Sequence, residues 1–160
     1  MRGGILPPGL LCVALGLALA FALPRQAWRA VAVLVPIAVC VWWFQFPPKY
    51  LEIAFLGCWI SVIATAGLVH LPGSVPSAAA IFAGANAGFW SGGLSSLAGS
   101  GRDLMIALLC TLVFLPARAL VVRGWGIGPK IVASWLMAIA VLASMLPLTP
   151  TPGYVPDHME

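Results

Sequence analysis

The sequence predicts an all-α protein, a polytopic transmembrane helical bundle of six short helices, with five helices as the alternative. Of its 160 residues, 62% are hydrophobic, and the mean hydropathy is +1.06. The 8 Lys and Arg residues and 4 Asp and Glu residues are too few to cover the surface of a soluble domain of this length. Apolar runs of about 18 or more residues recur along the chain, and as helices they match the roughly 30 Å thickness of a bilayer core.

Proline and glycine separate these runs and set the expected ends of the helices. The first helix closes at Pro24, and Pro47 and Pro48 follow the second. Pro129 suits the first turn of the last helix, and Pro147 suits its stop. We place the six helices at residues 5–23, 27–46, 50–71, 77–98, 103–122 and 129–146.

Loops of only a few residues join these helices, so we expect helices that are consecutive in the chain to pack against each other antiparallel. The predicted bundle covers residues 1–148. Residues 149–160 form a polar, proline-rich tail that we expect outside the membrane and extended. Because the chain is short and has no large loop or targeting extension, we expect a bacterial inner (plasma) membrane.

The distribution of Lys and Arg predicts the orientation, because cytoplasmic loops carry the excess of positive charge. With six crossings, Arg2, Lys49 and Arg102 fall on one side of the membrane. Five basic residues fall on the other side, namely Arg25, Arg29, Arg118, Arg123 and Lys130. This excess favours both termini outside the cytoplasm. If the fourth helix is re-entrant instead, the termini face opposite sides.

Small residues recur at every fourth position of the fourth helix. They form one stripe against which another backbone can approach closely, as in glycine-zipper and GxxxG association. Three roles fit this stripe: a packing seam within the chain, a contact with another subunit, or the lining of a re-entrant pore segment. Its members are Ala80, Gly84, Gly88, Gly92, Ser96 and Ser100.

Asn86, Trp90 and Ser91 are the polar side chains of the glycine-rich part of this helix. Each needs a partner, because hydrocarbon offers no hydrogen bonds. We expect Asn86 to bond to a neighbouring helix, with a contact to a substrate or ion as the alternative. Trp90 and Trp59 are expected to pack inside the bundle, with binding of a lipid or pigment ring as the alternative.

Arg118, Arg123 and Lys130, with Trp125 among them, form the most basic edge of the predicted bundle. We interpret this edge as a rim for lipid headgroups, because anionic lipids attract such residues on the cytoplasmic face. Docking of an acidic partner is the alternative. His70 lies at a helix end, where we expect it to cap the helix or reach the interface.

No residue pattern in the sequence predicts catalysis, a metal site or a cofactor. No acidic or basic residue falls at the centre of a predicted helix, where proton pumps and ion-coupled transporters keep one. The four cysteines lie singly inside apolar runs, so we expect buried small side chains rather than a disulfide or metal site. We therefore expect no enzyme activity, no catalytic residues, no metal and no cofactor.

These observations favour a non-catalytic integral membrane subunit or scaffold of a larger membrane protein assembly. The expected partners are the lipid bilayer and other membrane protein subunits or copies of the chain itself, and no nucleic acid. The alternative is a small facilitator or channel for an uncharged or lipid-like solute, with the glycine-rich part of the fourth helix lining the path. A third interpretation is an enzyme acting on a lipid through His70 or through Arg102 and Asp103.

Overall fold

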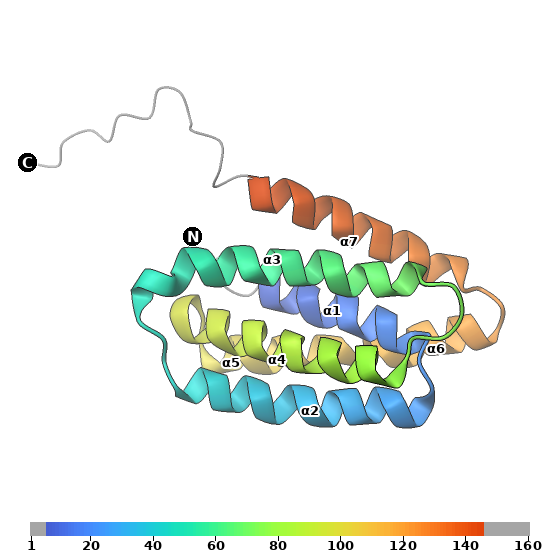
Figure 1. The fold of residues 1–160 in the computed structure, drawn as a ribbon, viewed down its shortest axis with the longest axis horizontal. Helices are drawn as coiled ribbons and strands as arrows, with labels where there is room; N and C mark the ends of the chain where they lie inside the picture. The colour runs from blue at the N-terminus through green and yellow to red at the C-terminus, as the bar shows by residue number, and fades with distance from the viewer. Residues whose placement is uncertain (1–5, 146–160) are drawn as a thin grey trace, which may run out of the picture.

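The computed structural model describes residues 6–145 of the chain. In this range the chain folds into six helical segments that run alternately in opposite directions (Figure 1). The prediction of six helices is therefore confirmed over the described range. The segments are α1 (Leu6–Ala20), α2 (Pro24–Trp43), α3 (Leu51–Gly67), α4 (Ser77–Ala98), α5 (Gly101–Cys110) continued by α6 (Phe114–Val122), and α7 (Ile127–Met145). The predicted tail and Arg2 lie outside the described residues.

The helix ends follow from local sequence. The start of α4 at Ser77 and its end at Ala98 agree with the prediction. The second helix starts earlier than predicted, at Pro24, because proline fits the first helical turn, where its missing N–H has no partner to lose. It also ends earlier, at Trp43, and Gln45 then adopts a positive φ of 41° ahead of Pro47. This turn directs the chain into the short 3-10 helix η2 (Pro48–Tyr50) and on into α3.

A single 3-10 turn, η4 (Thr111–Val113), joins α5 to α6. Pro116 follows this turn closely, and it cannot donate to the carbonyl of Leu112 four residues earlier. The chain tightens into 3-10 geometry at this point. Gly16 of α1 lies against the tightened turn, since a Cβ atom built on it would lie 2.7 Å from the carbonyl oxygen of Thr111. The fifth predicted helix is thus one segment with an internal 3-10 turn.

Four helical segments of the described chain are long and apolar enough to cross a membrane: Pro24–Trp43, Pro48–His70, Gly101–Val122 and Ile127–Met145. The other two are α1, which has only 15 residues, and α4, which has 22 residues and many glycines and serines. Apolar spans of this kind imply contact with a lipid bilayer. The chain is thus a multi-pass helical membrane protein.

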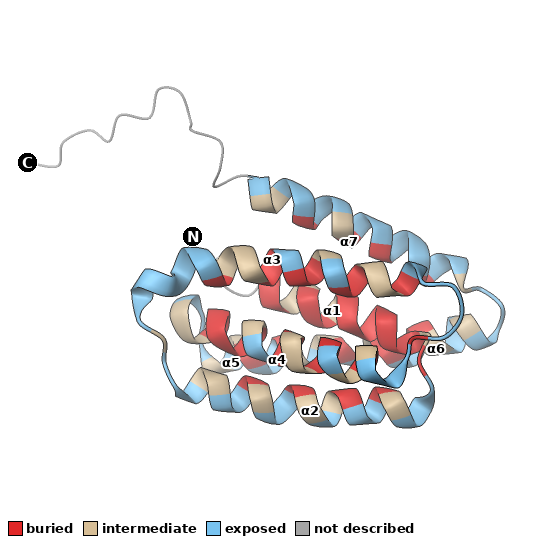
Figure 2. Cartoon of the chain, in the orientation of Figure 1, coloured by how far each residue is buried: buried red, intermediate tan, exposed pale blue. Residues whose placement is uncertain are grey.

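The hydrophobic core is centred on α1. Eleven of its 15 residues are buried, and α3, α4, α5 and α6 all pack against it (Figure 2). By contrast, α2 and α7 lie at opposite edges of the bundle, where half of the residues of α2 and most of those of α7 are exposed (Figures 1 and 2). The short helix is therefore enclosed by protein, and the longer apolar helices α2 and α7 face outward.

The expectation that consecutive helices pack against each other is wrong for three pairs: α1 with α2, α2 with α3, and α6 with α7. α2 makes its most extensive contact with α4, touches α1 only slightly and does not pack against α3, although only three residues link α1 to α2. α7 packs mainly against α3 rather than against α6. The reason for the first exception is the glycine content of α4, which lets the backbone of α2 come unusually close.

This close approach runs along the stripe of small residues on α4. A Cβ atom built on Gly84 would lie 2.5 Å from a carbonyl oxygen of α2. One built on Gly88 would lie 2.6 Å from the carbonyl oxygen one turn further along α2. Such distances are too short for real Cβ atoms, so only glycine fits. The pairs in contact are Gly84 with Ala30, Gly88 with Leu34, and Gly92 with Ala38. The structure thus places the central part of the stripe against a helix of the same chain.

Two members of the predicted stripe have other surroundings. Ser96 is half-buried, and its hydroxyl donates to the carbonyl of Gly93 at 2.7 Å. Ser100 does not belong to the stripe, because α4 ends at Ala98 and Ser100 is the N-cap of α5. There the Ser100 N–H donates to the Asp103 carboxylate at 2.8 Å, and the Asp103 N–H donates to the Ser100 hydroxyl at 3.4 Å. Ala80, at the other end of the stripe, is buried.

The described Lys, Arg, Asp and Glu residues separate into two sets at the two ends of the bundle. The end formed by the α1–α2, α3–α4 and α6–α7 connections carries Arg25, Arg29, Arg118, Arg123 and Lys130 and no carboxylate among the described residues. The opposite end carries Lys49, Arg102, Glu52 and Asp103. Positive charge accumulates on the cytoplasmic side of membrane proteins. The end rich in arginine therefore faces the cytoplasm in the orientation we predict.

We predict that Gly84→Ala destabilises the protein by about 1–3 kcal/mol, because the added methyl group meets backbone atoms that cannot move aside. Thermal unfolding of the detergent-solubilised protein measures the effect. Gly67→Ala is the matched control, since nothing lies within 4 Å of a Cβ atom built on Gly67. An unfolding temperature for Gly84→Ala equal to that of the wild type would contradict the close approach of α2 and α4.

We also predict that a membrane-impermeant maleimide added to intact cells labels Phe44→Cys but not Ser74→Cys. Phe44 is exposed at the end of α2, and Ser74 is exposed in the connection that precedes α4, at the arginine-rich end. The wild-type protein, which has four cysteines, provides the background. Labelling of Ser74→Cys without Phe44→Cys would show the reverse orientation.

Candidate functional site

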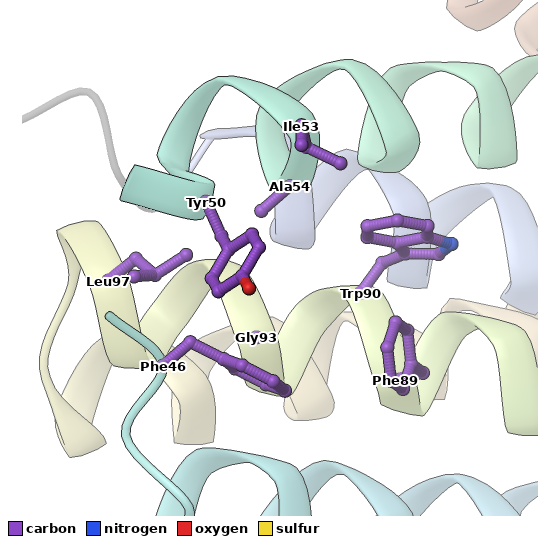
Figure 3. Close-up of a pocket in the computed structure, with 8 residues that line it drawn as sticks. All are labelled: Phe46, Tyr50, Ile53, Ala54, Phe89, Trp90, Gly93 and Leu97. Carbon is purple, nitrogen blue, oxygen red and sulfur yellow. The ribbon is translucent and has the colours of Figure 1, made fainter. Parts of the chain in front are cut away.

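An apolar cleft opens on the side of the bundle between α3, α4 and the chain that connects α2 to α3. Its volume is about 250 Å³ (Figure 3). It lies at the end of the bundle opposite the arginine-rich end, and four of its residues come from the second half of α4. The lining residues are Phe46, Tyr50, Ile53, Ala54, Phe89, Trp90, Gly93 and Leu97.

The cleft exists because one wall has no side chain. Gly93 lies beside Phe46, which comes from the turn after α2, and a Cβ atom built on Gly93 would have its nearest contacts at 3.8 Å. The rings of Phe46 and Phe89 meet edge to face, with 6.4 Å between their centroids. Tyr50 enters from the side of α3, with its hydroxyl turned toward Phe46 and Gly93 (Figure 3). Aromatic rings therefore surround a space that Gly93 leaves open.

Trp90 is the best anchored of these aromatic residues. Its indole ring lies against Gly57 of α3, where a Cβ atom would overlap the ring. Its N–H donates to the Asn86 side-chain oxygen at 3.0 Å. The expectation that Asn86 bonds to a neighbouring helix is therefore wrong. Its partner lies one turn along the same helix, because side chains four residues apart share a helix face.

This hydrogen bond determines what Trp90 presents to the cleft. The indole nitrogen points away from the open space, and the carbon atoms of the ring face it (Figure 3). Among the side chains that line the cleft, Tyr50 then presents a polar atom, its hydroxyl oxygen, on the open side. Lys49 lies at the same end of the cleft, with its ammonium group 5.1 Å from the centre of the Tyr50 ring. The site is thus a hydrocarbon surface with a cation beside it.

The predicted basic rim at the opposite end is divided by the structure. Arg118 is half-buried, and its guanidinium donates to the carbonyl of Ala22 at 2.6 Å. This bond ties α6 to the turn between α1 and α2. Arg123 and Trp125 are exposed at the end of α6, and the Lys130 ammonium lies 5.8 Å from the Phe21 ring. Arg118 therefore holds the bundle together, whereas Arg123 and Lys130 face outward.

His70 lies at the arginine-rich end, where its ring nitrogen Nε2 is 3.3 Å from the Ser134 hydroxyl of α7. This hydrogen bond fixes the position of His70 at the end of the short 3-10 helix η3 (Leu68–His70). Among residues 6–145, no group of three or more His, Cys, Asp or Glu side chains is placed to hold a metal ion. The His70 side chain thus links the end of η3 to α7.

The interior of the bundle contains a few small polar side chains. The Cys12 thiol of α1 lies 3.6 Å from the Ser91 hydroxyl of α4, and both residues are buried. Ser95 and Thr111 are also buried, and their hydroxyls have no partner within the described part of the chain. These groups are uncharged and small. They allow α4 and η4 to approach α1 closely.

The fold and the cleft define the class of protein: a multi-pass helical membrane protein with a side opening of hydrocarbon character. No family model, curated protein or solved structure matches the chain.

Sequence reasoning identified two residues near this site, Asn86 and Trp90, but not the cleft itself. Phe46 and Tyr50 are the last and the first residue of two predicted helices, and Gly93 lies one position beyond a member of the stripe. The cleft forms only because α2 packs on α4, so that the connection to α3 crosses the end of α4. A pairing between helices that are not consecutive in the chain leaves no signal in the periodicity of a single helix.

We predict that Arg118→Gln lowers the stability of the protein by about 1–3 kcal/mol, because the buried residue Ala22 loses the donor to its carbonyl. Thermal unfolding in detergent again measures the change. Arg123→Gln removes a charge of the same kind from an exposed position at the end of α6 and should leave the unfolding temperature unchanged. Equal effects of the two substitutions would show that charge, not the hydrogen bond, matters here.

Proposed function

We propose that this protein is a non-catalytic subunit or scaffold of a larger membrane protein assembly, located in a bacterial inner membrane. Its partners would be other membrane proteins or further copies of the chain, docked on the two edge helices. The observation that supports this proposal most directly is the position of α2 and α7, each of which packs mainly along one narrow seam, α2 against α4 and α7 against α3.

The two seams have the same design. Each edge helix buries only four residues, mostly small ones, spaced three or four apart. In α2 these are Ala27, Ala30, Leu34 and Ala38, and in α7 they are Pro129, Ala133, Leu136 and Ala140. Such spacing covers one narrow face of a helix. The exposed residues on the rest of both helices can contact lipid or another protein.

The outer faces of these helices combine large and small side chains. On α7, Trp135 is 71% exposed and Leu142 is 70% exposed, and the small residue Ala138 lies between them and is also exposed. On α2, the exposed Ala32 lies one turn before Pro36, which is also exposed. Association of helices in a bilayer depends on close packing around small residues rather than on hydrophobicity. These faces offer such packing surfaces.

The same structure argues against the facilitator hypothesis in the form that the sequence suggested. A path along the glycine stripe would need Gly84, Gly88 and Gly92 to face an opening, but the backbone of α2 covers all three. Two candidate residues of the enzyme hypothesis make contacts that support the fold. Asp103 accepts the hydrogen bonds of a helix cap, and His70 is bonded to Ser134.

We predict that the protein, purified gently from its native membrane, elutes as a particle larger than one chain and its detergent belt. The measurements are the particle mass and the identity of every co-purifying protein. Ala32→Trp and Ala138→Trp test the outer faces of α2 and α7, because a large indole there prevents close packing of a partner. At least one of them should reduce the particle mass.

Ala64→Trp is the matched control, since Ala64 is an exposed alanine of α3, away from the outer faces of both edge helices. It should leave the particle mass unchanged. A wild-type protein that is monomeric in its native membrane extract would overturn the proposed function. A large particle that tolerates both edge substitutions would show that partners dock elsewhere.

A further inference from the structure

The apolar cleft between α3 and α4 has features that identify the chemistry of its occupant. We propose that it binds one phospholipid, with a hydrocarbon chain lying along α4 and the headgroup at Lys49 and Glu52. This inference does not depend on the proposed assembly function, because it concerns a different surface and a different partner.

The shape of the cleft fits a hydrocarbon chain. It extends along α4 from Leu97 to Phe89, which is about 12 Å at 1.5 Å per residue. The helices of the bundle run side by side in alternating directions, so this axis follows the direction in which lipid chains lie in a bilayer (Figure 1). The volume of about 250 Å³ is below that of a typical site for a drug-sized molecule. A single chain segment suits it better.

The chemistry of the walls fits the same occupant. Phenyl rings, the carbon edge of Trp90 and aliphatic side chains line the space, and the indole nitrogen is bonded to Asn86 on the far side. An unpaired polar ligand would lose its hydrogen bonds on entry, at a cost that such walls cannot offset. A chain of methylene groups loses none. The Tyr50 hydroxyl, as a donor, can reach an ester carbonyl of a lipid.

The opening faces the bilayer rather than the interior of the protein. Ile53, Phe89 and Tyr50 line the cleft and are all exposed on the side of the bundle. These exposed apolar residues lie on the lipid-facing surface of a protein that spans the membrane. A chain can therefore enter sideways from the surrounding lipid without crossing water.

Charged residues at one end of the cleft match a zwitterionic headgroup. Lys49 lies beside Tyr50 and can pair with a phosphate. Glu52 is exposed on the first turn of α3, three residues after Lys49, which places the two residues one turn apart. A carboxylate at this spacing repels a purely anionic headgroup and attracts an ammonium group. The geometry points to phosphatidylethanolamine rather than phosphatidylglycerol.

The test is native mass spectrometry of the full chain in detergent, titrated with dioleoyl phosphatidylethanolamine or dioleoyl phosphatidylglycerol. The wild type should bind one molecule of either lipid, and the ethanolamine lipid more tightly. Gly93→Leu should weaken the binding of both by at least about tenfold, comparable to the loss of two buried methylene groups. Glu52→Gln should weaken only the preference for the ethanolamine lipid.

Gly67→Leu is the control for Gly93→Leu, since it adds the same side chain to a glycine with open space away from the cleft. If Gly93→Leu fails to fold, Ile53→Trp blocks the opening from an exposed position and leaves the core untouched. Lipid binding that survives both substitutions in the cleft would overturn the proposal. So would equal competition by glycerophosphoethanolamine, which has the headgroup and no chain.

The outcome is distinguishable from that of the assembly experiment. Loss of lipid from Gly93→Leu with an unchanged particle mass supports the phospholipid site, whatever the fate of the proposed assembly. If Gly93→Leu reduces the particle mass and leaves lipid binding at the wild-type level, the cleft receives a side chain of a partner protein, and the phospholipid proposal is wrong.

Discussion

The contact on which the rest of the structure depends is the approach of the α2 backbone to Gly84, Gly88 and Gly92 of α4. Because no side chain separates the two helices at these positions, α2 packs on α4 and leaves α1 free to contact the other helices. The connection from α2 to α3 must then cross the end of α4. This crossing brings Phe46 and Tyr50 over Gly93 and so creates the cleft.

The arrangement also explains how a 15-residue helix can occupy the centre of a membrane protein. At 1.5 Å per residue, α1 measures roughly 22 Å, less than the hydrocarbon thickness of a bilayer. It needs no full apolar span of its own because α3, α4, α5 and α6 enclose it. The small polar groups of Cys12, Ser91 and Thr111 are tolerated for the same reason, since they face protein and not lipid.

The sequence predicts the parts of this fold that depend on single helices. Long apolar runs, proline at the helix ends and the tract without charges from Ile53 to Gly101 predict six helices and the limits of α4. The sequence does not predict which helices of the bundle contact each other. The stripe on α4 indicates close packing, but nothing in its spacing identifies α2 as the helix in contact. The pairing of Asn86 with Trp90, and the cleft, likewise depend on atoms that only the folded chain brings together.

Two adjacent glycines of α4 show how this fold separates structural support from a binding surface. Successive residues of a helix point about 100° apart, so Gly92 and Gly93 face different neighbours. Gly92 faces the carbonyl oxygen of Ala38 and has no room for a Cβ atom, whereas Gly93 faces side chains of Phe46 and Val41 at 3.8 Å. A backbone contact cannot yield, but side chains can move apart. The rigid seam therefore fixes α2, and the softer wall one residue later can accommodate a chain that enters from the bilayer.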